Sequence, residues 1–153
     1  MTILAIDPGV TGALAWVTSD GILIDAVDVP IIVVRGKKKI SAAGLVTLMK
    51  TRSVSCVVIE GVASRPKQGV ASMFNFGYSA GLLEGAATAL GFPVQIIPAA
   101  TWKTGAGVSK DKGVARMMAT RFWPGAADKF ALVKNDGRAE AALLARWVAL
   151  KKS

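Results

Sequence analysis

Apolar residues occur along this chain in short runs that end at turn-forming or acidic residues. Residues 2–7 form one such run and predict a buried strand, and residues 12–17 and 22–29, which follow after tight turns, predict two more. Strands joined by such short turns form an antiparallel meander. Residues 54–60 are almost continuously apolar, which predicts a fourth strand buried on both faces of the sheet, and residues 92–97 predict a fifth.

Helical patterns lie between and after the later strands. Ser41 is well placed to cap the first helix, and three further helices are expected at residues 71–90, 111–122 and about 136–151. We expect loops at the basic segment 35–39 and at the Gly-rich segment 101–110. Together these elements predict an α/β fold with a five-stranded mixed sheet. In it, an antiparallel meander of strands 1–3 is followed by parallel strands, and helices flank both faces.

The composition is typical of one globular domain. The 153 residues, more than half of them apolar, are enough for a single domain over residues 1–153. The first thirty residues lack the Lys and Arg that a secretory signal needs. The apolar segment 72–92 is interrupted by Asn75 and Glu84, which argues against a membrane span. We therefore expect a cytoplasmic protein with no membrane partner.

Reactive side chains are few, and this restricts the chemistry. Cys56 is the only cysteine and histidine is absent. Zinc sites that need these ligands, and nucleophiles that a histidine activates, are therefore excluded. Cys56 itself lies in an apolar run and is expected to be a small buried residue. Any bound metal must have oxygen ligands, which favours Mg²⁺ or Mn²⁺, and we expect no organic cofactor.

The chain is strongly basic, with 19 bases, 10 acids and a formal charge of +9. Eleven of the bases follow residue 100, and none precedes Arg35. Such a field attracts a polyanion and accelerates the encounter with it. Charge alone does not distinguish DNA, RNA, nucleotides and acidic lipids, and a basic surface that only confers solubility is the alternative.

Four acids stand out against this basic background. Asp7 and Glu60 close the first and fourth strands, whose ends meet at one edge of the sheet if those strands are parallel neighbours. Asp136 and Glu140 lie four residues apart on the last helix and share one face of it. If that helix crosses the strand ends, the carboxylates converge and can hold two Mg²⁺ ions that serve phosphodiester hydrolysis.

Each acid also has a simpler interpretation. Asp7 can cap a turn, and Glu60 can be a solvated strand end. Asp136 can be a helix N-cap, and Glu140 can be an acid in the first turn that interacts with the helix dipole. All four simpler interpretations would have to hold together for the cluster to be absent.

The motifs around these acids form an ordered set: Ile6-Asp7-Pro8-Gly9 with Thr11-Gly12, Val57-Val58-Ile59-Glu60, and Asp136-Gly137-Arg138-Ala139-Glu140-Ala141. This set resembles the RuvC family of Holliday-junction resolvases over nearly the whole chain, and its last motif resembles the phage and phage-like branch. The resemblance implies an RNase H-like fold, a homodimer, and Mg²⁺ as cofactor with Mn²⁺ as a substitute. It places catalytic metal ligands at Asp7, Glu60, Asp136 and Glu140.

The same resemblance implies a structure-selective endodeoxyribonuclease. Members of this family resolve four-way DNA junctions by paired symmetric nicks that leave 5′-phosphate and 3′-hydroxyl ends. The expected setting is a bacterial cell, with the gene belonging to the bacterium or to a phage.

The last motif departs from the bacterial members, in which the final two acidic positions are three residues apart rather than four. Asp136 must then reach the site from the helix N-terminus, and Asp128 is a substitute ligand. Arg138 lies between Asp136 and Glu140 and is expected to pair with one of them.

The resemblance also implies DNA contacts. Lysines after the fifth strand approach the scissile phosphate in this family, which indicates Lys103, Lys110 and Lys112. We expect further contacts on the loop after Glu60 and in the basic segment, at Arg65, Lys67, Arg35, Lys37, Lys38 and Lys39. Phe74 is a candidate for insertion into the junction centre.

Three glycines, Gly77, Gly81 and Gly85, repeat every fourth residue on one face of the helix expected at 71–90. Small residues in a row permit close packing against another backbone. The partner is either the protein's own sheet or a second copy of the chain in a two-fold homodimer.

Three other functions fit parts of the pattern: a broader nuclease of the same fold that cuts flaps or forks, an inactive junction-binding protein, and a sugar-kinase or actin-like ATPase. The ATPase is disfavoured because it needs two domains of this kind, which 153 residues cannot supply. The full set of acids argues against an inactive protein. Branched DNA is therefore the expected partner.

Overall fold

The structure is a computed structural model of the chain, and it describes residues 1–61, 63 and 69–151. Its centre is a five-stranded sheet with the order β3-β2-β1-β6-β7. The strands are β1 (Thr2–Asp7), β2 (Ala13–Thr18), β3 (Leu23–Asp28), β6 (Cys56–Gly61) and β7 (Val94–Pro98). β1, β2 and β3 pair antiparallel, whereas β6 is parallel to both β1 and β7. The predicted mixed sheet, including the parallel neighbours that carry Asp7 and Glu60, is confirmed.

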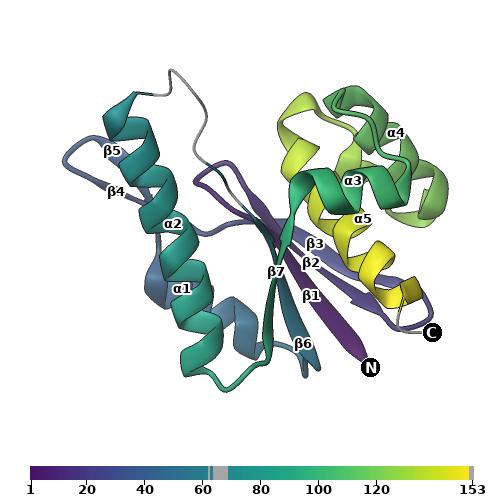
Figure 1. The fold of residues 1–153 in the computed structure, drawn as a ribbon, viewed down its shortest axis with the longest axis horizontal. Coiled ribbons are helices and arrows are strands. Elements are labelled where there is room, and N and C mark those ends of the chain that lie inside the picture. Colours follow the sequence, from purple (N-terminus) through teal and green to yellow (C-terminus); the bar gives the residue numbers. More distant parts are fainter. Residues whose placement is uncertain (62, 64–68, 152–153) are drawn as a thin grey trace.

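Helices cover both faces of this sheet, as predicted (Figure 1). On one face lie α1 (Ala42–Lys50) and α2 (Val70–Ala89), and on the other lie α3 (Ala99–Ala106), α4 (Lys112–Phe122) and α5 (Asp136–Lys151). Two short 3₁₀ helices, η1 (Pro124–Phe130) and η2 (Val133–Asn135), connect α4 to α5. In the part of the chain that the structure describes, no helix is both long and apolar enough to cross a membrane.

The alternation of side chains along β1 separates two apolar cores. Leu4 and Ile6 pack with residues of α1 and α2, whereas Ile3 and Ala5 pack with residues of α3, α4 and α5. Cys56 is buried in the second of these cores, as expected. Asp7 follows the same alternation and therefore belongs to the face that α5 covers.

Small residues line the contact between α5 and the sheet. The buried residues on the sheet side include Ala5, Ala13 and Ala15, and those on α5 include Ala139 and Ala142. Alanine side chains let the helix axis lie closer to the strands than larger residues would. This close approach allows an acidic side chain in the first turns of α5 to reach the strand ends.

The basic segment 35–39 is not the expected loop. β4 (Ile31–Val34) and β5 (Lys37–Ile40) form an antiparallel hairpin, and the expectation was wrong. The hairpin turns at Arg35 and Gly36, whose φ angles of 49° and 73° are both positive, as a two-residue type I′ turn requires. Asn-Gly or Asp-Gly is the usual signal for this turn, so an arginine at the first position concealed it.

The expected loop at 101–110 is also wrong, because α3 covers most of it. Trp102 is fully buried in the core and anchors the helix, although neighbouring glycine and threonine residues are poor helix formers. Gly107, with a φ of 67°, ends α3 in the left-handed conformation. Gly105 serves packing, since a Cβ there would lie 2.6 Å from the indole nitrogen of Trp147. Tertiary contacts have therefore overridden local propensity.

Candidate metal centre

The two strand-end acids meet because of the register between β1 and β6. Ala5 pairs with Val58 in this parallel ladder, and Asp7 and Glu60 each lie two residues further along. Since side chains alternate, both acids project from the same edge of the sheet and onto the face that α5 covers. The side chain of Glu60 is only 12% exposed, which contradicts the interpretation of a solvated strand end.

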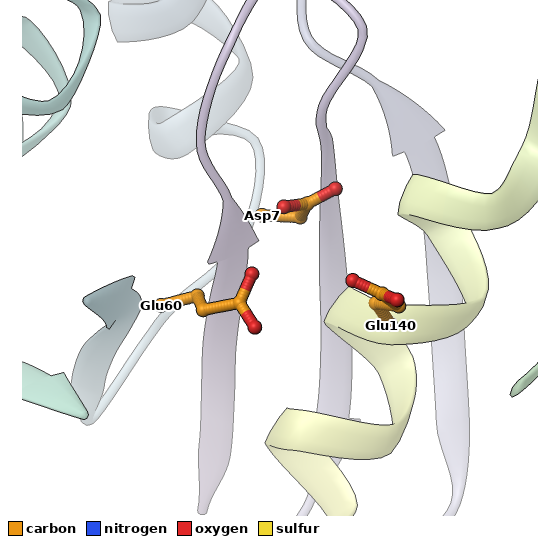
Figure 2. A group of neighbouring side chains, drawn as sticks. All are labelled: Asp7, Glu60 and Glu140. Atoms are coloured by element: carbon orange, nitrogen blue, oxygen red, sulfur yellow. The ribbon is translucent and has the colours of Figure 1, made fainter. Parts of the chain in front are cut away.

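The third acid, Glu140, comes from the second turn of α5. One carboxylate oxygen from each of Asp7, Glu60 and Glu140 lies within 4.8 Å of the others. Figure 2 shows the three side chains directed toward a common space from two strands and the helix. Residues that are more than fifty positions apart in sequence are thus brought to one point by the sheet register and by α5.

Glycines make this close approach possible. A Cβ on Gly137, in the first turn of α5, would lie 2.9 Å from Oδ2 of Asp7 and 3.1 Å from the backbone oxygen of Thr11. A Cβ on Gly12 would lie 1.9 Å from the backbone oxygen of Asp7. Any larger residue at either position would push α5 or the turn after β1 away from the carboxylates.

Two neighbouring residues on α3 complete the centre. Nζ of Lys103 lies 2.9 Å from Oε1 of Glu140 and 3.7 Å from Oε1 of Glu60. The indole nitrogen of Trp102 donates a hydrogen bond of 3.0 Å to the same Glu60 oxygen. Sequence reasoning placed Lys103 near a phosphate and assigned no site role to Trp102. Because the helix α3 was not predicted, no signal in the sequence indicated that both side chains turn toward the acids.

The cluster has more negative than positive charge, because three carboxylates meet one ammonium group. Burial, followed by the negative charges of Glu60 and Glu140, holds the pKa of Asp7 well above its usual range. Burial alone would lower the pKa of Lys103, but its hydrogen bond with Glu140 and the surrounding carboxylates raise it above the ordinary value. Clustered carboxylate oxygens with this surplus of negative charge are a suitable donor set for a hard divalent cation. The three acids could therefore hold a metal.

Asp136 lies apart from this cluster. Its Oδ1 accepts a hydrogen bond of 2.7 Å from Nε of Arg116 on α4. Among the described residues, the acids that meet within 4.8 Å are Asp7, Glu60 and Glu140. Asp136 nevertheless lines a cavity of about 170 Å³ together with Asp7 and Glu140. Arg116 was not identified from the sequence, because nothing local relates it to an acid twenty residues away.

Two further expectations about charged residues near Asp136 are not met. Arg138 pairs with neither Asp136 nor Glu140; instead its guanidinium makes hydrogen bonds of 2.6 and 2.9 Å to the carboxylate of Asp28 on β3. Asp128 lies in η1 and does not belong to the acid cluster of the described residues. The pair between Arg138 and Asp28 instead attaches the first turn of α5 to the edge of the sheet.

The other proposed DNA contacts lie at several places. Lys110 is exposed between α3 and α4, and Lys112 begins α4. The basic residues of the hairpin are exposed, with Arg35 at its turn and Lys37, Lys38 and Lys39 on β5. Phe74 on α2 is 71% exposed. Arg65 and Lys67 lie outside the described residues.

Comparison with known proteins gives similarity at the level of structure. No protein-family model and no curated protein sequence matches the chain. Thermus thermophilus RuvC in complex with a Holliday junction substrate superposes with a TM-score of 0.66 at 14% identity, over 99% of this chain and 96% of that one. A second structure of Thermus thermophilus RuvC gives 0.63 at 17% identity, over 99% and 97% of the chains. At this level of identity the similarity establishes the fold, and the chain has the RNase H-like α/β fold of RuvC.

Proposed function

We propose that this chain is a metal-dependent, structure-selective endodeoxyribonuclease that resolves four-way DNA junctions. It makes paired symmetric nicks that leave 5′-phosphate and 3′-hydroxyl ends. The observation that carries the proposal is the meeting of Asp7, Glu60 and Glu140 within 4.8 Å at the strand ends of a RuvC-like fold. Each acid comes from a different element, so the cluster depends on the whole fold rather than on a local motif.

The acids would hold Mg²⁺, with Mn²⁺ as a substitute. Asp7, Glu60 and Glu140 would provide the clustered oxygens, and Asp136, which lines a cavity with Asp7 and Glu140, would be a fourth ligand. When bound there, the ion supplies an activated water and offsets the negative charge that accumulates on the phosphate. Attack by this water needs no side-chain nucleophile, which fits a chain without histidine.

The residues around the acids orient them and balance their charge. Trp102 fixes one oxygen of Glu60 through its indole N–H, and Lys103 brings an ammonium group to the cluster. Because an ammonium group is a compact positive charge, Lys103 is suited to contact the scissile phosphate. Arg116 holds Asp136 at the side of the cavity.

Further basic residues would contact the DNA arms. Lys110 and Lys112 follow α3, and the hairpin carries Arg35, Lys37, Lys38 and Lys39. We also assign Arg65 and Lys67 to DNA binding on the basis of their position after Glu60 in the sequence. Contacts of this kind neutralise phosphates, so binding should weaken steeply as the salt concentration rises.

A homodimer would provide the second active site that paired nicks require. Ser79, Leu83 and Ala87 form the buried side of α2, whereas positions 77, 81 and 85 are offset from them by two residues and point the opposite way. A Cβ at any of those three glycines would meet nothing within 4 Å. The glycine face is therefore not packed on the protein's own sheet, which leaves a second copy as its proposed partner.

The decisive experiment is cleavage of a labelled synthetic four-way junction beside linear duplex, flap and fork controls. Wild type and Glu60→Gln are compared in Mg²⁺ and in EDTA. The proposal requires paired symmetric nicks at the junction that disappear with EDTA and with Glu60→Gln. Metal-dependent cutting spread equally over flaps and forks would replace it with a broader branch nuclease. Binding without cutting in either Mg²⁺ or Mn²⁺ would leave an inactive junction-binding protein.

A further inference from the structure

The acid cluster already contains a positive charge that comes from the chain itself. The ammonium group of Lys103 lies 2.9 Å from Glu140 and 3.7 Å from Glu60, and its side chain is only 19% exposed. These are the same two acids that, with Asp7, bring their oxygens within 4.8 Å of one another. The ammonium group and a divalent cation would therefore contact the same carboxylates.

This arrangement differs from an ordinary surface ion pair. The surface pair between Arg138 and Asp28, for example, joins one base to one acid whose side chain is 55% exposed. Lys103 instead lies between two acids, each with a side chain only 12% exposed, at a cluster where three carboxylates meet. A single ammonium group leaves the cluster with a net negative charge, so a cation of higher charge has reason to replace it.

We propose that Lys103 is a resident counter-ion that occupies the acid cluster in the metal-free protein and leaves it when a divalent cation binds. Its released ammonium group is then free to face the phosphate of the substrate. The inference rests on the metal site of the proposed function, but not on the kind of DNA that is cut. It assigns Lys103 two successive partners rather than one.

We expect this exchange to leave the backbone in place. Lys103 reaches the acids on a flexible four-carbon side chain, whereas the adjacent Trp102 is fully buried and bonded to Glu60. Trp102 therefore keeps α3 and Glu60 in place while the lysine side chain moves. Because Lys103 is on α3 and Glu140 is on α5, breaking their contact does not interrupt either helix.

Two roles for Lys103 predict effects of opposite sign on metal binding. If the ammonium group competes with the cation for Glu140 and Glu60, its removal must tighten metal binding, because linkage is reciprocal. If Lys103 only positions the two acids, its removal must weaken metal binding. Cleavage is expected to fall in both cases, so activity alone does not separate the two roles.

The test is calorimetric titration of Mn²⁺ without DNA, on wild type, Lys103→Met and the matched control Lys50→Met at the exposed end of α1. We expect Lys103→Met to bind Mn²⁺ about tenfold more tightly, a change typical for loss of one charge-assisted contact. Lys50→Met should bind as wild type does. Unchanged or weaker binding by Lys103→Met would overturn the proposal.

A second measurement uses wild type and does not depend on the folding of a variant. The rate of acetylation of Lys103 is measured by mass spectrometry with and without Mg²⁺, with Lys50 as the internal reference. Release from the cluster predicts faster labelling of Lys103 in Mg²⁺, and equal rates would count against it. Tighter Mn²⁺ binding by Lys103→Met, in a protein that cuts no branched DNA, would retain this inference and refute the proposed nuclease.

Discussion

Asp7→Asn should stabilise the metal-free protein, although it should abolish cleavage. Asp7 is partly buried, and one of its carboxylate oxygens lies within 4.8 Å of an oxygen of Glu60 and of Glu140. The substitution keeps the size of the side chain and removes one of three converging negative charges. Since a functional site gives up stability for chemistry, the effect should be opposite to that of most core substitutions.

The magnitude follows from the geometry of the cluster. Two unit charges 4.8 Å apart repel by about 3.5 kcal/mol at an effective dielectric constant of 20. Asp7 takes part in two such pairs, and the nearby positive charge of Lys103 offsets part of their repulsion. Partial proton sharing among the carboxyl groups reduces the remainder further. We therefore expect Asp7→Asn to gain about 2 kcal/mol, or about 4–8 °C in melting temperature for a chain of this length.

The pH dependence has a definite sign. Burial, followed by Glu60 and Glu140, raises the pKa of Asp7, so the stability that its protonated form contributes is complete below its ordinary pKa. That stability is lost as the pH rises through the raised pKa of the folded state. The advantage of Asp7→Asn over wild type should therefore be small near pH 4 and should grow toward neutral pH.

The assay is urea unfolding in EDTA at several pH values, repeated in Mg²⁺. Asp25→Asn is the matched control, because the pKa of Asp25 is shifted in the opposite direction. Burial alone would raise this pKa, but Lys129, the Ala26 amide and Arg52 lower it below its ordinary value. The ion pairs of Asp25 stabilise the fold at pH values above its ordinary pKa. Asp25→Asn should therefore lower the free energy of unfolding at neutral pH. Mg²⁺ should stabilise wild type but not Asp7→Asn. If Asp7→Asn in EDTA at neutral pH is no more stable than wild type, the cluster does not carry the repulsion we infer.

Three further substitutions test single contacts. Trp102→Phe removes the indole donor to Glu60 and leaves a smaller aromatic ring in a buried position, so it should cost at least about 1 kcal/mol in urea unfolding and slow junction cleavage; unchanged cleavage would exclude a positioning role. Gly137→Ala places a methyl group 2.9 Å from Oδ2 of Asp7. The free energy of unfolding should therefore fall by about 1–3 kcal/mol, and calorimetric titration should show weaker Mn²⁺ binding. Gly81→Arg should leave the fold of each protomer intact, since a Cβ at this position meets nothing within 4 Å, but should yield monomers in sedimentation, and a persistent dimer would place the interface elsewhere.

Much of the fold could be predicted because strand and helix patterns depend on local periodicity. The run at residues 54–60 is apolar on both sides, which is typical of a central parallel strand, and β6 is such a strand. The hairpin of β4 and β5 and the helix α3 were not predicted. The first depends on positive φ angles at Arg35 and Gly36, and the second on burial of Trp102. Local propensity contains neither effect.

The sequence by itself determined the chemistry available to this protein. It excludes histidine ligands and a cysteine-based zinc site, and it places Asp7 and Glu60 at the ends of two predicted strands. The tertiary structure alone decided which groups meet. It brings Lys103 to Glu140 and Arg116 to Asp136, and it sends Arg138 to Asp28. The physical reason is that strand ends follow from short-range periodicity, whereas a contact between two helices depends on how both pack against the sheet.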